Sequence, residues 1–274
     1  MKKVKSLASI ILLYLFRGRR GKMSFKSCRS YWYFRHAVKN KSRFILDDES
    51  KDFLKAVENT CASRIKTISI SDSLWRAQIG CDYMPLYQDN IHVDDLPIPF
   101  AFERMKPLSN SASEGRANPK GIPYLYVATD KETAMSEVRP SLGAILSVGE
   151  FQPTRELKII DFSVHQGKMK LFLKEPDEKK RIETVWTDMD NAFSIPTINS
   201  DFHSDYVPTQ IIAELIKSLG YDGIAYKSSL ASGRNIALFD LESAKISECN
   251  IYKVNKVNYG FESVENCFSN SWVS

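Results

Sequence analysis

Three side chains that could share one ligand lie within a short stretch of the chain, Gly115 to Pro140. The stretch reads GRANPKGIPYLYVATDKETAMSEVRP. Arg116 supplies a cation in a polar loop, Tyr126 an aromatic ring in an apolar run, and Glu137 a carboxylate further on. Loops, strand edges and helix ends are where side chains of consecutive elements converge on a ligand. An anionic ligand that contains a ring would need all three groups.

Local signals predict the elements that carry these groups. The residues Ile122–Val127 are aromatic and β-branched, which is typical of a strand. Thr129 and Glu132 have the spacing of a capping box, so a helix is expected to begin at about Asp130. In that helix Glu137 lies beside the apolar stripe. Spacing alone leaves open whether it faces a site or is an ordinary surface glutamate one turn before the helix end.

A second cation lies upstream in an alternating segment, Leu74–Ile79, which predicts a strand. Arg76 falls on the face opposite Trp75. Because a buried cation is costly unless it is paired, Arg76 is either half of a structural salt bridge or an anion contact. The segments Ala144–Phe151 and Leu157–Phe162 are expected to be further strands, and Leu171–Phe193 to be partly helical.

The block from Asp205 to Asp240 predicts a helix followed by two strands. Pro208 suits the first helical turn, and Gly220 suits the C-terminal cap. The strands are expected at Gly223–Lys227 and Asn235–Phe239. Ser228 and Ser229 fall at the end of the first strand, where a hydroxyl can point into a cleft or simply form a turn.

Positive charge is concentrated at the start of the chain. Thirteen lysines and arginines precede the first acidic residue, Asp47, and the rest of the chain holds 25 basic against 33 acidic residues. This basic head could contact a nucleic acid, an anionic membrane or an acidic partner, or be a solvated arm. Its ten-residue apolar run, Leu7 to Phe16, is too short to span a membrane. We expect a helix on the protein or at a membrane surface, with a secretory leader as the alternative.

The composition predicts a packed, cytoplasmic protein. At 274 residues and 43% hydrophobic content, the chain can hold one large domain with an appendage. The five cysteines are scattered and form no Cys-x-x-Cys pair, which indicates neither a disulfide framework nor a zinc site. The four histidines are isolated as well, so no metal site is expected. Residues 1–68 are expected to form a helical appendage, with Asp47 or Asp48 capping one of its helices, 69–250 the main domain and 251–274 a tail.

Taken in order, these motifs resemble the RES domain family, which is named for its recurrent Arg, Glu and Ser. The resemblance covers roughly residues 70 to 245 and includes Gln210, Tyr221-Asp222-Gly223-Ile224 and the closing Asn-Ile-Ala-Leu-Phe. It rests on Arg76 in Trp-Arg-Ala, Arg116 in Gly-Arg-Ala-Asn-Pro, Tyr126 in Leu-Tyr-Val-Ala, Glu137 in the next helix, and Ser228 in Gly-Ile-Ala-Tyr-Lys-Ser. Each motif is weak alone, but five in the right order are specific.

The resemblance implies a compact α/β (α+β) domain with a mixed sheet, similar to the ADP-ribosyltransferase fold. It implies NAD+ as the substrate rather than a cofactor, consumed with phosphate or water as acceptor. It also implies a bacterial toxin that is often neutralised by an antitoxin with an Xre-like DNA-binding domain. An appendage of this length departs from the family pattern, and the resemblance does not supply its role.

The residue types suit cleavage of the nicotinamide riboside bond. Nicotinamide leaves a cation as a neutral molecule, so the difficulty lies in the oxocarbenium-like ribose, which a carboxylate can stabilise. Glu137 would do this, while the arginines hold the pyrophosphate or an incoming phosphate by forked hydrogen bonds. The candidate catalytic residues are Glu137, Arg76 and Ser228, and the candidate substrate contacts are Arg116, Tyr126, Ser229 and Gln210.

Two other functions stay open from the sequence. An enzyme of the same fold could transfer ADP-ribose to a protein or a nucleic acid. Alternatively, the basic head could make the chain a nucleic-acid-binding or ribonuclease-like protein with no turnover of NAD+. Neither a Gly-x-Gly-x-x-Gly fingerprint nor a P-loop occurs, so neither a Rossmann dinucleotide site nor a P-loop site is predicted.

Overall fold

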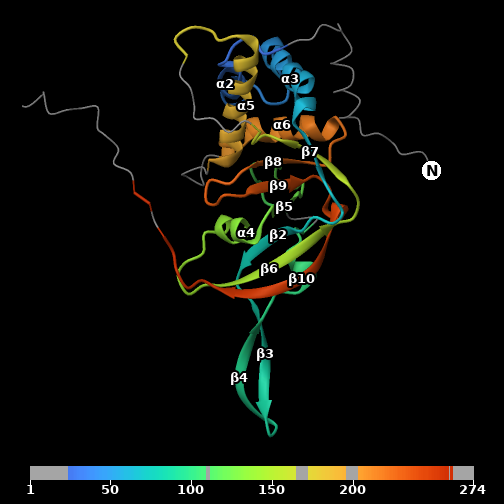
Figure 1. The fold of residues 1–274 in the computed structure, drawn as a ribbon, viewed down its shortest axis with the longest axis vertical. Coiled ribbons are helices and arrows are strands. Elements are labelled where there is room, and N and C mark those ends of the chain that lie inside the picture. Colours follow the sequence, from blue (N-terminus) through green and yellow to red (C-terminus); the bar gives the residue numbers. More distant parts are fainter. Residues whose placement is uncertain (1–23, 109–111, 165–171, 196–202, 259, 262–274) are drawn as a thin grey trace, which may run out of the picture.

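A curled eight-stranded sheet forms the centre of the molecule (Figure 1). The structure is a computed structural model that describes residues 24–108, 112–164, 172–195, 203–258 and 260–261. Along the sheet the strand order is β1-β7-β8-β9-β5-β2-β6-β10. Neighbours are antiparallel except β7 and β8, which are parallel. The mixed α+β fold expected from the sequence is therefore confirmed.

The sheet strands are short except at its β6–β10 edge. They are β1 (Ile65–Ile68), β2 (Leu74–Ile79), β5 (Leu125–Ala128), β6 (Ile145–Pro153), β7 (Leu157–Asp161), β8 (Gly223–Lys227), β9 (Arg234–Leu238) and β10 (Ala244–Lys253). The bounds of β2 and β8 are those expected from the sequence. Strand β10 continues three residues past the predicted end of the domain at residue 250.

Four helices cluster at one end of the sheet, and a shorter helix lies near its middle (Figure 1). The cluster consists of α2 (Ser30–Asn40), α3 (Asp48–Thr60), α5 (Glu178–Ser194) and α6 (Val207–Ser218), and the shorter helix is α4 (Lys131–Glu137). Helix α6 has Pro208 in its first turn and ends before Gly220, which has a φ of 89°. None of the helices within the described ranges is long and apolar enough to cross a membrane.

One apolar core joins the N-terminal helices to the rest of the molecule. Phe34 of α2 and Phe53 of α3 belong to the same buried cluster as Trp186 of α5, Ile212 of α6 and Ile224 of β8. Helices α2 and α3 therefore bury their apolar faces against the main body rather than against each other alone. The predicted division at residue 68 stays a prediction. The apolar run Leu7 to Phe16 lies outside the described residues.

Helix α4 begins one residue later than the capping box predicts, because a different side chain caps it. Its N-cap is Asp130, whose carboxylate accepts hydrogen bonds from the Thr133 backbone N–H (2.8 Å) and the Thr133 hydroxyl (2.8 Å). Thr129 instead donates its hydroxyl to Asp130 and accepts from the Arg234 backbone N–H. Helix α4 ends at Glu137, and Arg139, two residues later, takes a left-handed φ of 48°, which is common just past the end of a helix.

A two-stranded hairpin that the sequence reading missed projects from the end opposite the helices (Figure 1). It pairs β3 (Asp82–Gln88) with β4 (Ile91–Ile98). Asp89 and Asn90 form its turn with φ of 51° and 65°, the left-handed geometry of tight hairpins. Pro85 and Pro97 within the strands weaken the strand signal in the sequence.

Replacing Asp130 tests whether this cap fixes the helix that carries Glu137. Asp130→Ala removes the acceptor of three hydrogen bonds, so the free energy of unfolding should fall by about 1–2 kcal/mol in urea denaturation. Asp130→Asn keeps a capping oxygen and should lose less. An Asp130→Ala protein as stable as the wild type would show that the cap contributes nothing.

Candidate functional site

A cavity of about 320 Å³ opens where β2, β5, β9 and the end of α4 meet. Its wall contains Arg76 from β2, Tyr126 from β5, Glu137 from α4 and Asn235 from β9, together with Arg116 from the loop before β5. The remaining lining residues are Trp75, Ala77, Glu114, Gly115, Val127, Ala128, Ala134, Val138, Tyr206 and Tyr226. The structure thus brings four of the seven predicted site residues to one cavity, within the size range of small-molecule sites.

The Glu137 carboxylate is held through one of its two oxygens. Oε1 accepts a hydrogen bond from the Ser228 hydroxyl (2.6 Å) and another from Asn235 Nδ2 (2.7 Å). Both donors are buried, with side chains from the end of β8 and the start of β9. No described residue donates a hydrogen bond to Oε2. The carboxylate is therefore fixed in direction while one oxygen is left for a ligand.

Ser228 is arranged as a donor to Glu137. Its oxygen accepts from the backbone N–H groups of Leu230 (3.0 Å) and Ala231 (3.1 Å). With both lone pairs engaged, its single hydrogen points to the carboxylate. An attacking nucleophile would need a free lone pair, so this geometry supports a positioning role.

Arg76 is a cation without a compensating anion. One guanidinium nitrogen donates to the Tyr126 carbonyl oxygen (2.9 Å), whereas its Nε is buried without a partner. No described carboxylate lies within salt-bridge distance. Burial lowers the pKa of Arg76 below its ordinary value, but a guanidinium stays protonated at neutral pH. Of the two possibilities left by the sequence, the salt bridge is absent among the described residues, and the anion contact stays a prediction.

Arg116 is held by the end of helix α5. It donates to the carbonyl oxygens of Phe193 (2.9 Å) and Ser194 (3.1 Å). These carbonyls belong to the last turn of the helix, where basic groups are favourable. Because carbonyl oxygens carry only partial charge, the second guanidinium also keeps most of its positive charge for a ligand.

Tyr126 ties the Gly-Arg loop to the sheet. Its hydroxyl donates to Asn118 Oδ1 (2.7 Å) and accepts from the Ala117 backbone N–H (3.0 Å). Burial raises the pKa of Tyr126 to about 12, so the phenol stays neutral at physiological pH. Gly115 lies so close that a Cβ there would meet the Tyr126 hydroxyl at 2.7 Å. This close approach explains why the loop needs glycine.

Two other predicted contacts do not line the cavity. Gln210 is buried beneath the loop, where its Nε2 donates to the carbonyl oxygens of Gly115 (3.0 Å) and Asn118 (3.1 Å). Ser229 is exposed. Their predicted contacts with a substrate stay predictions. In the structure Gln210 holds the loop that contains Gly115 and Asn118.

Sequence reasoning missed Asn235 as a site residue. It lies directly opposite Tyr226 in the antiparallel pairing of β8 with β9, and both line the cavity. The position of Asn235 at the start of a predicted strand, in Asn-Ile-Ala-Leu-Phe, was visible in the sequence. Its distance to Glu137 was not, because the two residues are 98 positions apart.

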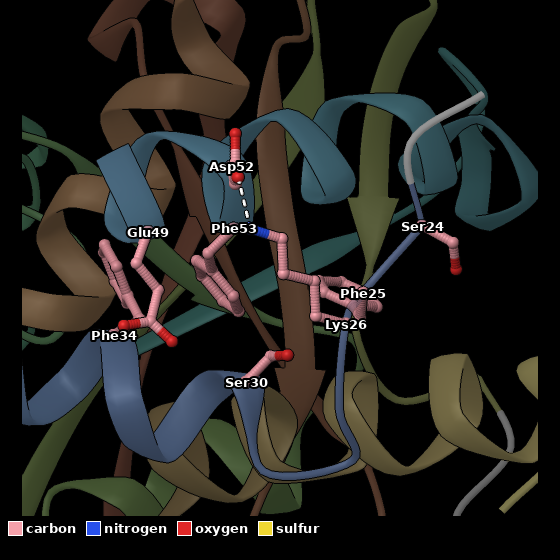
Figure 2. A pocket seen from close by; sticks show the side chains of 8 residues that line it. All are labelled: Ser24, Phe25, Lys26, Ser30, Phe34, Glu49, Asp52 and Phe53. Atoms are coloured by element: carbon pink, nitrogen blue, oxygen red, sulfur yellow. Dashed lines mark hydrogen bonds and ion pairs between the residues drawn. The ribbon is translucent and has the colours of Figure 1, made fainter. Parts of the chain in front are cut away.

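A second crevice, between α2 and α3, is too small to hold a substrate. Figure 2 shows its lining, with the Phe34 and Phe53 rings and, beside Phe53, the ion pair of Lys26 with Asp52. Its volume is about 20 Å³, room for one water molecule. Within the described ranges no group of three or more His, Cys, Asp or Glu side chains could hold a metal ion.

A family model decides the relationship of this chain to known proteins. The model of the RES domain matches residues 95–261, more than half of the chain. The chain belongs to the RES domain family. The match includes Arg116, Tyr126, Glu137 and Ser228, whereas Arg76 lies upstream of it.

Two further comparisons add little to the RES assignment. No curated protein sequence matches the chain closely enough to count as a relative. Among solved structures, the chain is similar to one in the crystal structure of the M. tuberculosis MbcT–MbcA toxin–antitoxin complex. The identity is 15%, the alignment covers 70% of this chain and 89% of that one, and the TM-score is 0.35. The family model therefore carries the assignment.

Anion binding at Arg76, which has no ion pair among the described residues, should be measurable without any reaction. We expect pyrophosphate to bind the wild-type protein in calorimetry, and Arg76→Gln to weaken that binding about tenfold or more, because a charge-assisted hydrogen bond is lost. Arg155→Gln is the control, since Arg155 is paired with Asp222 (2.6 Å) outside the cavity. Equal loss in both variants would contradict a specific anion contact at Arg76.

Proposed function

We propose that this RES protein is an enzyme that degrades NAD+ by breaking the bond between nicotinamide and ribose. The observation that supports this most directly is the Glu137 carboxylate, which neutral donors fix through one oxygen in a cavity that also contains two guanidinium groups with no ion pair among the described residues. A dinucleotide presents a pyrophosphate and a ribose that becomes positively charged as the bond breaks. The cavity offers cations for the first and a carboxylate for the second.

The chemical step balances without a cofactor. The bond between ribose C1 and the pyridinium nitrogen breaks, and its electron pair leaves with nicotinamide, which becomes neutral. The positive charge passes to the ribose as an oxocarbenium-like centre, and the Glu137 carboxylate stabilises it. An oxygen of phosphate or water then forms the new bond to C1, and water loses a proton. Arg76 and Arg116 would bind the pyrophosphate or the incoming phosphate.

We also propose that the protein acts as a toxin and that an antitoxin partner, of the Xre-like type, neutralises it. Membership of the RES family supports this proposal. The partner would need only to cover the opening of the cavity, through which a substrate would enter. Phosphate is the acceptor if the two guanidinium groups bind a phosphate ion beside NAD+, and water is the acceptor if they bind only the pyrophosphate of NAD+.

Glu137→Gln tests the role of the carboxylate. Glutamine retains an oxygen to accept from Ser228 and Asn235 but carries no charge, so NAD+ consumption should fall about a hundredfold or more with little loss of stability. Glu132→Gln is the matched control, an exposed residue on the same helix. A Glu137→Gln protein that consumes NAD+ at the wild-type rate would refute the assignment.

The same reaction identifies the acceptor. The purified wild-type protein is incubated with NAD+, with and without phosphate, and the ribosyl product is identified by mass spectrometry. ADP-ribose phosphate indicates phosphorolysis, and free ADP-ribose indicates hydrolysis. Mass added to a protein or nucleic acid instead would contradict NAD+ degradation and indicate transfer.

Asn235→Ala tests positioning as distinct from binding. It removes one of the two donors to Glu137 Oε1, so the carboxylate should be held less firmly and kcat should fall about tenfold, with KM changed less. Asn235→Asp would place a second negative charge beside Glu137 and should be worse than alanine. If Asn235→Ala raised only KM, the residue would be a substrate contact and not a positioning residue.

A further inference from the structure

The β3–β4 hairpin carries a cluster of large apolar side chains that are exposed to solvent. Seven large apolar side chains on it are each between 38% and 67% exposed: Tyr83, Met84, Leu86, Tyr87, Ile91, Val93 and Leu96. The hairpin projects away from the sheet as a separate two-stranded unit (Figure 1). Two strands alone are marginally stable in water, and clustered exposed apolar groups mark interaction surfaces.

Both faces of the hairpin are apolar, while its edges are blocked. In the strand register Met84 lies opposite Leu96 on one face, and Tyr83 and Tyr87 fall on the other. Pro85 and Pro97 each remove a backbone donor, and a paired strand tolerates proline only where its nitrogen faces the free edge. Addition of a further strand is therefore disfavoured, and a partner would bind through the side chains of a face.

The hairpin is also acidic. No lysine or arginine occurs from Ala77 to Glu103, and the hairpin itself carries Asp82, Asp89, Asp94 and Asp95. Asp82 is paired with Arg104 (3.5 Å). Asp94 and Asp95 are exposed, Asp95 contacts the His92 ring nitrogen (2.9 Å), and neither meets a lysine or arginine among the described residues. Two hairpins packed face to face would bring these carboxylates together, which is unfavourable. The surface fits an apolar partner with positive charge.

Helix α2 presents such a surface at the opposite end of the molecule (Figure 1). Arg29, Trp32, Tyr33 and His36 have the spacing of one helix face and are all exposed. Trp32 is 58% and Tyr33 50% exposed. Lys41 and Arg43, just past the end of the helix, are also exposed, and no acidic residue lies between Ser24 and Leu46. These six residues form the α2 patch.

We propose that the β3–β4 hairpin of one copy of this chain docks on the α2 patch of a second copy. Apolar side chains meet aromatic ones, and the aspartates at positions 94 and 95 meet the cations at positions 29 and 43. Tyrosine, tryptophan and arginine are the residue types enriched in protein interfaces. The two surfaces belong to different parts of the chain, so two antiparallel copies related by a two-fold axis would form the contact twice.

The test is a charge exchange between copies, which does not depend on any enzymatic activity. One variant is Asp94→Lys with Asp95→Lys, and the other is Arg29→Glu with Arg43→Glu. Neither arginine takes part in an ion pair among the described residues, and thermal unfolding checks that both variants fold. Lys245→Glu with Lys253→Glu, both exposed on β10, is the control. Association is measured by sedimentation velocity on nuclease-treated protein over a wide range of concentrations.

We expect the wild type and the control to form dimers, and each patch variant alone to associate about tenfold more weakly or not at all. An equimolar mixture of the two variants should dimerise again, because each reversed patch then finds its opposite charge. High salt should weaken all of these dimers. A wild type that stays monomeric, variants that dimerise as well as the wild type, or association that disappears with nuclease would each overturn the proposal.

Discussion

Neutral hydrogen-bond donors, not the nearby arginines, hold the carboxylate of Glu137. Had Arg76 or Arg116 paired with it, the charges would have cancelled and the cavity would offer a ligand little. Instead Ser228 and Asn235 hold one oxygen, while a backbone carbonyl oxygen holds Arg76 and two hold Arg116. A cation and an anion therefore persist in the same cavity without neutralising each other.

The order of the strands in the sheet brings these polar side chains to one cavity. Strands β9, β5 and β2 are neighbours in space but lie far apart in sequence, and each contributes one polar side chain to the cavity wall. Helix α4 follows β5 directly in the chain, and Glu137, its last residue, lines the same cavity as the three strands. The Asp130 cap sets where that helix begins and with it the position of Glu137, about two turns later.

Local patterns in the sequence predict the bounds of some elements but not which side chains meet in the cavity. The bounds of β2 and β8 follow from alternation and turn residues, which act over a few positions. Thr129 and Asp130 are both good caps. In the structure Asp130 caps the helix, and the Thr129 hydroxyl accepts from the backbone N–H of Arg234, a residue distant in sequence. The hairpin was missed because its two prolines obscure the strand signal. Asn235 was missed because strand register brings it to Glu137.

Helix α5 joins two parts of the molecule that the sequence presents as separate. Its last turn holds the Arg116 guanidinium through two carbonyl oxygens, while Trp186, two turns earlier, belongs to the core shared with α2 and α3. The same helix therefore contacts both the guanidinium and the core of the N-terminal helices. The N-terminal helices thus pack, through this shared core, against the same helix whose last turn holds the Arg116 guanidinium at the cavity.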